Sequence, residues 1–254
     1  MPNDTTLETG LAAAEVDIMR SVEDELWWYR ALRHHVLASM NPAQPNFDLL
    51  DAGCGSGGML ARIREHFPQA SLTALDFSER ALEVTAARNT GAKLVHGRVD
   101  ALPFEDAQFD FALSLDVLTV RGVDDRAAMR EFYRVLKPGG RLLVNLPALE
   151  FLRGSHDVAV NQTHRVTGAE LKGLLREAGF QIEHCTYWNM LLTIPIALVR
   201  RVSRLKVESE VHSDLRPVWP PLNALLTGLT KAELAISRAI PLPFGSSVFA
   251  VARK

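Results

Sequence analysis

Acidic residues and glycines stand together where the chain could bind a nucleotide-containing ligand. Residues 47–58, FDLLDAGCGSGG, predict a short buried strand that ends at Asp51, a glycine-rich turn and the start of a helix. Glycine tolerates positive φ angles and lets a ligand lie against bare backbone, while the N-terminus of a helix offers N–H groups and positive partial charge. The pattern alone fits several nucleotide-containing cofactors.

A second acid sharpens this interpretation. Asp76 follows a second predicted strand, residues 71–75, and lies 25 residues after Asp51. In open α/β sheets an acid at the tip of the second strand accepts hydrogen bonds from ribose hydroxyls. Asp76 could instead cap the helix predicted to begin near Ser78. We favour the ribose role because strand, turn and acid occur together.

A later polar cluster has the side chains needed to move a proton. His156 and Asp157 are followed closely by His164 and Arg165. They come after the fifth predicted strand, at the carboxyl edge where open sheets bind ligands. Histidine is the side chain best suited to accept a proton near neutral pH. Either histidine alone fits a surface loop better, but for the pair with Asp157 a functional role and a structural one are about equally good.

The elements that would position these residues alternate between strand and helix. This alternation predicts a parallel sheet with right-handed crossovers. The predicted strands are residues 47–50, 71–75, 93–96, 109–115, 141–146, 180–187 and 246–253, and the helices between them are residues 59–66, 78–89, 124–136 and 167–179.

The N-terminal segment carries three consecutive aromatic residues. Residues 11–40 read as a continuous helical pattern that Asn41-Pro42 ends. The aromatics at 27–29 cannot all face one core from a helix. They either divide between core and surface or form a lid over a ligand pocket, with Arg30 or Arg33 offered to an acidic group.

About sixty residues separate the sixth predicted strand from the last one. They hold an apolar helix from Met190, a basic turn at 200–206, a proline-rich loop at 217–221 and a second helix ending near Ala239. We favour two helices that cover one another or a homodimer partner. A roof over the substrate, or a helix lying on a lipid surface, is the alternative.

Composition excludes several classes of protein. The formal net charge is -2 over 254 residues, so no overall basic field would hold nucleic acid. Cys54 and Cys185 provide neither metal-ligand spacing nor a disulfide framework, so we expect no metal site and a reducing, cytoplasmic compartment. The polar N-terminus has no secretory pattern, and the longest apolar run, residues 190–199, is about half as long as a membrane span.

In order and spacing, these motifs closely resemble those of the class I SAM-dependent methyltransferases (SAM, S-adenosylmethionine). Residues 49–57 are similar to that family's first motif, hhDxGxGxG, Asp76 to its second-strand acid, and Asp100-Ala101 with the following Leu-Pro-Phe to its adenine-contacting segment. The helix ending in RVLKPGG, residues 134–140, is the most specific signal and is frequent in the small-molecule subgroup. The resemblance implies a Rossmann-like, seven-stranded, mostly parallel sheet with helices on both faces, divided into an N-terminal helical lid (1–42), a SAM-binding core (43–188), a helical insertion (189–244) and the last core strand (245–254).

The resemblance also implies a set of cofactor contacts. The glycines would lie against the methionine portion of SAM, the second-strand acid would bind the ribose, and the residues after the third strand would bind adenine. In this chain the residues are Asp51, Gly53, Gly55 and Gly57 for the methionine portion and its loop, Asp76 and Phe77 for ribose and adenine, Asp100 and Ala101 for adenine, and Leu115 at the edge of the methyl-transfer site.

Methylation of a hydroxyl needs a base, whereas a neutral amine needs little help. A related bacterial subgroup carries a Tyr-His or Glu-His pair after strand four, where this chain has Thr119-Val120, and this departure weakens the assignment of a base at strand four. The candidates for the base are, in falling order, His156, His164, Asp116 and Tyr187, and those for binding the acceptor are Trp28, Tyr29, Arg33, Asp157 and Arg165.

We therefore expect transfer of a methyl group from SAM to an O, N or C atom of a small or medium-sized acceptor, with S-adenosylhomocysteine as the other product. An amphiphilic quinone or lipid precursor, with contact to a membrane surface, is the less favoured acceptor. A SAM-binding protein without transferase activity is the rival from another class. A NAD-dependent oxidoreductase is more distant, because the turn reads GxGxG and Asp100-Ala101 would have no role.

Overall fold

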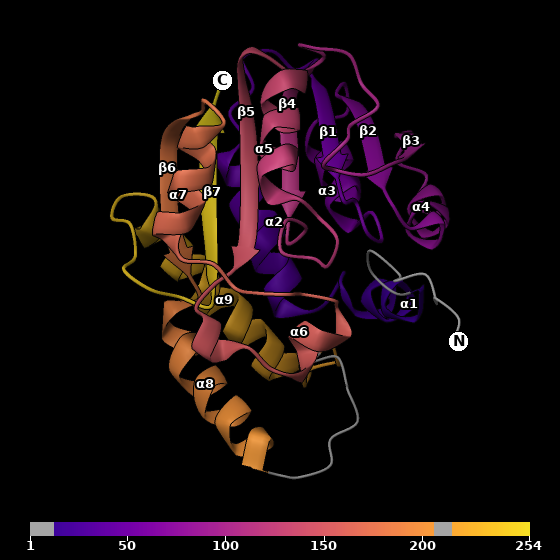
Figure 1. Cartoon of the computed structure of the whole chain (residues 1–254). Helices are drawn as coiled ribbons and strands as arrows, with labels where there is room; N and C mark the ends of the chain where they lie inside the picture. The colour runs from indigo at the N-terminus through magenta and orange to yellow at the C-terminus, as the bar shows by residue number, and fades with distance from the viewer. Residues whose placement is uncertain (1–12, 206–214) are drawn as a thin grey trace, which may run out of the picture.

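The computed structural model describes residues 13–205 and 215–254, with the side chains of residues 199–205 left out. A seven-stranded sheet forms its centre, with the strand order β3-β2-β1-β4-β5-β7-β6 (Figure 1). Only β7 runs antiparallel to its neighbours in this sheet. The strands are β1 (Asp48–Ala52), β2 (Ser71–Asp76), β3 (Lys93–His96), β4 (Phe109–Leu115), β5 (Leu136–Pro147), β6 (Gln181–Trp188) and β7 (Ser247–Arg253).

The central strands are apolar at nearly every position because helices cover both faces. Leu49 and Leu50 of β1 pack into different core clusters on opposite sides of the sheet, as do Leu142 and Leu143 of β5. Consecutive strand residues point to opposite faces, so a doubly covered strand has no place for polar alternation. The predicted mostly parallel sheet is confirmed.

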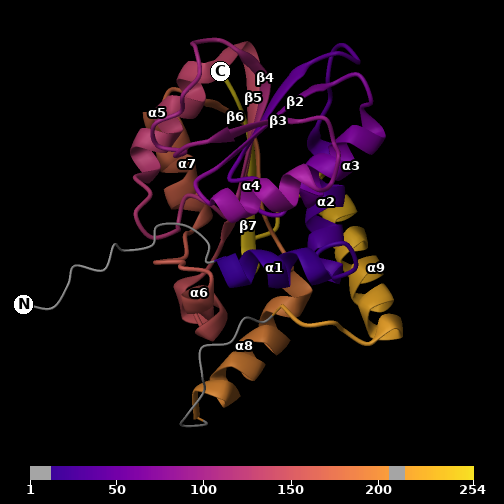
Figure 2. The same ribbon diagram turned by 90° about the vertical axis from the view of Figure 1, so that its right-hand side faces the viewer.

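Two groups of helices cover the two faces, and Figure 2 shows them on either side of the sheet. One core cluster contains α5 and α7, and the other contains α2, α3 and α9. Side-chain caps fix the starts of α4, α5 and α7, through Ser78, Asp124 and Thr167. The bounds are α2 (Trp27–Ser39), α3 (Gly58–His66), α4 (Glu79–Ala86), α5 (Asp125–Val135), α7 (Gly168–Glu177) and α9 (Pro220–Ser237).

The N-terminal segment departs from the sequence-based prediction of one continuous helical stretch. It forms α1 (Ala13–Val22) and α2, which are separated at residues 23–26. The break turns Glu23 inward, where its carboxylate pairs with Arg33 and Arg88 and accepts a hydrogen bond from the Ser56 hydroxyl. A straight helix could not bring that carboxylate to the glycine turn.

The insertion between β6 and β7 contains α8 (Met190–Leu205) and α9, close to the predicted positions. Helix α9 packs against α2 and β6, whereas α8 extends away from the sheet toward η1 (Glu150–Leu152) (Figures 1 and 2). Over the described residues the two helices therefore do not cover one another, and the other half of the favoured prediction, that they cover a homodimer partner, stays a prediction. No helix in the part of the chain described here is long and apolar enough to cross a membrane. The predicted basic turn at 200–206 is wrong over residues 200–205, which continue helix α8, and Lys206 lies outside the described residues.

Candidate functional site

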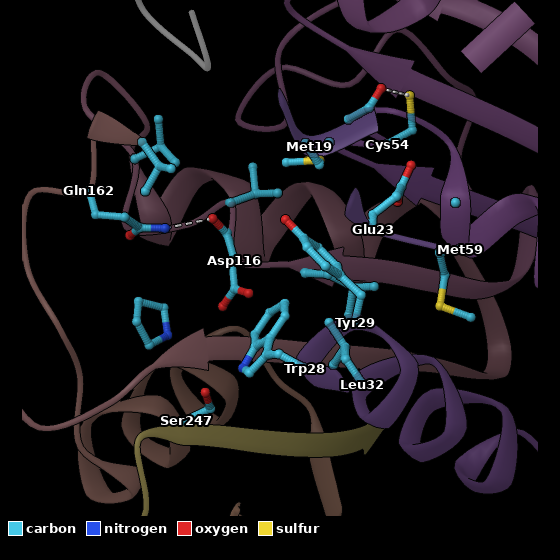
Figure 3. A pocket seen from close by; sticks show the side chains of 18 of the residues that line it. Met19, Glu23, Trp28, Tyr29, Leu32, Cys54, Met59, Asp116, Gln162 and Ser247 are labelled. Carbon is cyan, nitrogen blue, oxygen red and sulfur yellow. Dashed lines mark hydrogen bonds between the residues drawn. The ribbon is translucent and has the colours of Figure 1, made fainter. Parts of the chain in front are cut away.

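A cavity of about 500 Å³ lies at the carboxyl ends of the parallel strands, around the point where the strand order reverses between β1 and β4. Figure 3 shows Trp28 and Tyr29 of α2 and Asp116, the first residue after β4, around this cavity. Residues from α1 and α2, the glycine turn, α6 (Ser155–Ala159) and the insertion complete the wall.

The glycine turn holds its shape through the neighbouring strands. The N–H groups of Gly53 and Cys54 donate to the Leu75 carbonyl, at 2.7 and 3.0 Å. Gly53 has a φ of 88°, and a Cβ there would collide with Val117 at the end of β4. Only glycine allows this left-handed turn to pack so closely.

Gly53 and Gly55 reach the cavity wall, but Gly57 does not. Gly57 begins α3 with a φ of 75°, and a Cβ on it would lie 2.8 Å from the Thr85 hydroxyl. Gly57 therefore allows α4 to pack closely, and the ligand contact expected of it stays a prediction. Gly58, which we did not single out, lines the cavity and leaves room for the Glu23–Arg33 pair.

Asp76 links the glycine turn to the start of α4 and also lines the cavity. Its Oδ2 accepts a hydrogen bond from Gly55 N–H and its Oδ1 accepts one from Ser78 N–H, both at 2.9 Å. Ser78 itself provides the helix cap, since its side chain accepts from Ala81 N–H. Burial raises the pKa of Asp76 against the effect of these hydrogen bonds.

The negative charge around the turn fits a cationic ligand. Burial, followed by the charges of Asp76 and Glu23, raises the pKa of Asp51 to about 7. All three carboxylates line the cavity. A ligand that carries sulfonium and ammonium charges, as SAM does, would offset this crowding of negative charge.

Phe77 and Asp100 also line the cavity, next to Arg98. The Arg98 guanidinium lies 5.9 Å from the centre of the Phe77 ring and pairs with Asp100 at 2.6 Å. Burial alone would raise the pKa of Asp100, but hydrogen bonds from Arg98 and from Asp124 N–H lower it overall. The carboxylate therefore stays ionised and able to accept.

Ala101 does not take the place that the resemblance implies. Its N–H donates to the Arg98 carbonyl at 3.3 Å, within a tight turn, and the residue is exposed outside the cavity. The amide is therefore already used by the turn itself.

Asp116 lies at the end of β4 with its side chain in the middle of the cavity (Figure 3). Its backbone has a φ of 61°, and its carbonyl accepts a hydrogen bond from Gln162 Nε2 at 2.9 Å. Asn145 Nδ2 donates to Asp116 Oδ1, also at 2.9 Å. Burial raises the pKa of this carboxyl to about 7, and the Asn145 hydrogen bond opposes that rise.

A buried tryptophan fixes the orientation of the Asn145 amide. Trp188 Nε1 donates to Asn145 Oδ1 at 2.8 Å, which directs the amide nitrogen toward Asp116. Sequence reasoning missed both residues. The available signal was Asn145 itself, a polar residue within the apolar strand RLLVNLP.

The aromatics of α2 pack around this acid. Trp28 stacks on Trp188 with ring centres 5.6 Å apart, and Tyr29 meets Trp28 edge-on at 5.0 Å. Trp28, Tyr29 and Leu115 line the cavity, where the ligand contacts predicted for them would be possible. Burial, followed by the charges of Glu23 and Asp116, raises the pKa of Tyr29, so its hydroxyl stays neutral.

Arg33 also lines the cavity, but its charge is already paired. Its Nη2 lies 2.6 Å from Glu23 Oε2, and both side chains are about 95% buried (6% and 5% exposed). Glu23 was not predicted, because an acid four residues before an aromatic run carries no motif.

The polar cluster after β5 separates into two parts. His156, Asp157 and Arg165 line the cavity. Arg165 Nε pairs with Asp157 Oδ1 at 2.8 Å and Arg165 Nη1 donates to the Ala148 carbonyl, so this buried pair fastens α6 to the end of β5. His164 is exposed beside the Thr163 hydroxyl, outside the cavity, so the predicted pair of histidines does not form.

Tyr187 is likewise occupied elsewhere. Its hydroxyl accepts a hydrogen bond from Gly168 N–H at 2.7 Å, at the start of α7, and the residue does not line the cavity. Of the four predicted bases, only His156 and Asp116 reach the site. Among the described residues, no group of three or more histidines, cysteines or acids is arranged to hold a metal ion.

Comparisons with known proteins agree with this site. A family model described as a methyltransferase domain matches residues 50–144. An S-adenosylmethionine-dependent methyltransferase of Mycolicibacterium smegmatis is 28% identical over 186 residues, which cover 71% of this chain and 69% of that protein. The ubiquinone/menaquinone biosynthesis C-methyltransferase UbiE of Rhizobium leguminosarum bv. trifolii is 37% identical over 141 residues, covering 52% of this chain and 54% of that protein. The chain thus spans about half the length of this second relative.

Among solved structures, the complex between the Haloferax volcanii Trm112 methyltransferase activator and a methyltransferase contains a chain with a TM-score of 0.62. The two chains are 20% identical, and the match covers 95% of this chain and 93% of that one. At this identity the likeness shows the fold alone.

The sheet order, with a glycine turn and an acid at its switch point, defines a Rossmann-like nucleotide-binding enzyme core. Together with the family match over residues 50–144 and the named relatives, it supports a class I SAM-dependent methyltransferase. Its methyl donor is SAM.

Proposed function

We propose that the chain methylates a hydroxyl group on a largely apolar small molecule, with Asp116 as the general base. The observation that carries this proposal is a half-buried carboxyl group in the middle of the cavity, oriented by an amide. When bound, SAM supplies a methyl group that its positively charged sulfur has already activated.

The glycine turn and its acids would hold the cofactor. Gly53 and Gly55 offer bare backbone to the cavity, Asp76 would bind the ribose, and Phe77 and Asp100 would hold adenine. Asp51 adds negative charge beside the turn. These residues orient the donor and take no part in moving protons.

Asp116 has the properties that a base for this reaction needs. A pKa of about 7 leaves much of the carboxyl ionised near neutral pH while keeping it basic enough to accept a proton. Asn145 occupies Oδ1, which leaves Oδ2 to accept the proton of the acceptor hydroxyl. We prefer Asp116 to His156 because its orientation is fixed by Asn145 on the neighbouring strand β5.

The other half of the cavity favours an acceptor with an apolar body. Aromatic and aliphatic side chains form this half, and they come from α2, the loop after β4, α6 and the insertion. They include Trp28, Val117, Val120, Val160, Ile196, Leu215 and Val218. An aromatic or alicyclic alcohol would bury its ring there.

The test is transfer of a labelled methyl group from SAM to a panel of hydroxylated aromatic and alicyclic compounds. Asp116→Asn should lower kcat by about 10²–10⁴-fold, while calorimetry shows SAM affinity within about twofold of the parent. His164→Gln, outside the cavity, is the matched control and should keep full activity. Full activity in Asp116→Asn together with loss of activity in His156→Gln would transfer the role of base to His156.

A further inference from the structure

A buried serine stands at the edge of the sheet where the cavity lies. Strand β7 is antiparallel to its neighbours, so its first residue, Ser247, is paired with Pro147 and Trp188, the last residues of β5 and β6. Ser247 lines the cavity, although the residue is only 4% exposed. The antiparallel strand thus brings a hydroxyl group to the edge where the parallel strands end.

The position of Ser247 in the sheet directs its side chain toward α2. Alternate residues of a strand point to the same face, so Ser247 shares a face with Phe249, which packs in the core cluster that contains Trp188 and residues of α2. Asn145 is paired with Phe249, which makes Asn145 and Ser247 diagonal neighbours on that face, about 7–8 Å apart. Because Asn145 binds the Asp116 carboxylate, one small molecule could contact both Asp116 and Ser247.

Two hydrogen-bond donors at this place have no partner within the described part of the chain. They are the Ser247 hydroxyl and the indole N–H of Trp28. Buried polar groups in proteins are normally hydrogen-bonded. Trp188, on which Trp28 stacks, follows that rule, because its own indole N–H donates to Asn145. In Figure 3 the indole nitrogen of Trp28 is turned toward Ser247, so both donors face the same part of the cavity.

The strand order separates these two donors from the cofactor residues. The glycine turn and Asp76 follow β1 and β2, and Asp100 follows β3, whereas Ser247 lies on β7, beyond β4 and β5. Asp116, directly after β4, lies between the two groups in this order. The ligand atom that completes the hydrogen bonds of Ser247 and Trp28 therefore belongs to the methyl acceptor and not to SAM.

We propose that the Ser247 hydroxyl and the Trp28 indole N–H donate to a carbonyl oxygen of the acceptor, while Asp116 receives the proton of its hydroxyl group. An indole N–H can only donate, and a carbonyl oxygen has two lone pairs, so one such oxygen satisfies both groups. A carboxylate fits less well, because its negative charge would lie close to that of Asp116. This inference rests on the proposed function and narrows the acceptor to hydroxylated ketones and related carbonyl compounds.

The test compares acceptors that differ only in the carbonyl group. Calorimetry on the full chain with S-adenosylhomocysteine measures the affinities of the three hydroxyacetophenones and of the three ethylphenols, in which a CH₂ group replaces the carbonyl. At least one hydroxyacetophenone should bind about threefold to tenfold more tightly than the ethylphenol with the same ring substitution. Equal or weaker binding of all three ketones would overturn the proposal. So would tighter binding of the hydroxybenzoates, because the subsite would then hold an anion.

Two variants assign the preference to the two donors. Ser247→Ala and Trp28→Phe should each bring the ratio of ketone to ethylphenol affinity close to one. A general loss of folding or packing weakens both compounds alike, so the ratio reports the carbonyl contact. Ser114→Ala is the matched control: it removes another fully buried hydroxyl without a partner in the described structure, but outside the cavity, and should leave the ratio unchanged. A ratio that stays at the parent value in both Ser247→Ala and Trp28→Phe would also overturn the proposal.

The binding measurement is independent of the proposed base. If Asp116→Asn keeps full activity, the role of Asp116 is wrong, but a ketone preference that depends on Ser247 and Trp28 still supports the carbonyl subsite. If Asp116→Asn loses activity and the ketone preference is absent, the base is supported and the subsite is wrong.

Discussion

At the scale of single residues, the orientation of Asp116 depends on an amide from a neighbouring strand. Asn145 donates to its carboxylate, and Trp188 holds that amide in place. A donor to a carboxylate stabilises the ionised form. Asn145 is therefore a positioning residue that also sets the pH range in which Asp116 can act.

Replacing Asn145 should move the pH profile. In the parent enzyme kcat/KM should rise with pH through about 7 as Asp116 ionises. In Asn145→Leu the acidic limb should shift to higher pH, because the lost hydrogen bond no longer opposes the effect of burial. The measurement is kcat/KM against pH with the acceptor found in the labelled-methyl assay.

Gln162→Met provides the control for this shift. Gln162 binds the backbone carbonyl of Asp116 and not its carboxylate, so its loss should leave the acidic limb in place. If the acidic limb of kcat/KM against pH does not move in Asn145→Leu, that limb reports the ionisation of a group other than Asp116.

At the scale of elements, the break between α1 and α2 creates a buried ion cluster. Glu23 pairs with Arg33 and Arg88, and the side chains of all three are less than one-tenth exposed. Arg88 Nε also donates to the Ser56 carbonyl at 2.6 Å. The cluster joins the N-terminal helices to the glycine turn and to the end of α4, around the cofactor site.

Glu23→Gln should destabilise the fold by up to about 3–5 kcal/mol, because two buried guanidinium groups lose their buried carboxylate partner and keep only the partly exposed Asp24. The free energy of unfolding from denaturant titration measures this. Glu25→Gln, two residues away on an exposed side chain, should change stability by no more than about 0.5 kcal/mol. Equal stability of the two variants would show that the cluster does not anchor α1 and α2.

At the scale of the whole molecule, a neutral histidine lies where the N-terminal helices meet the sheet. The His35 ring is fully buried, 4.0 Å from the Phe249 ring centre and 6.3 Å from that of Trp188. Neither ring nitrogen has a hydrogen-bond partner in the described structure. Burial, followed by the charges of His184, Arg238 and His34, lowers the pKa of His35 to about 3.

Stability should therefore fall as the pH falls from 6.5 toward about 3. In that window the unfolded chain protonates His35 and the folded chain does not, so unfolding gains up to about 1.4 kcal/mol per pH unit from this group. His35→Phe should flatten the dependence of Tm on pH in this range, whereas His66→Gln, on the exposed end of α3, should leave it unchanged. If Tm depends on pH in the same way in His35→Phe as in the parent, His35 is not the group that causes the loss of stability.

Much of the fold could be predicted because its signals are local. Apolar runs marked the strands, Thr167 and Glu170 marked the start of α7, and glycines marked the turn after β1. Asp51, Asp76 and Asp100 were found for the same reason, since each directly follows a strand or belongs to a short motif. Gly57 and Ala101 do not line the cavity, and the motif could not show this because it does not say which amides the turns themselves use.

The sequence by itself determined the order of strands and helices, the glycine turn and the acids at the sheet edge, because short-range periodicity and backbone chemistry dictate them. Only the tertiary structure decided which side chains meet. Asn145 reaches Asp116 from another strand, Glu23 reaches Ser56 and Arg88 across the cofactor site, and His164 turns outward while His156 turns in. These contacts join segments far apart in the chain or depend on how a loop docks, and no local pattern encodes the packing that brings them together.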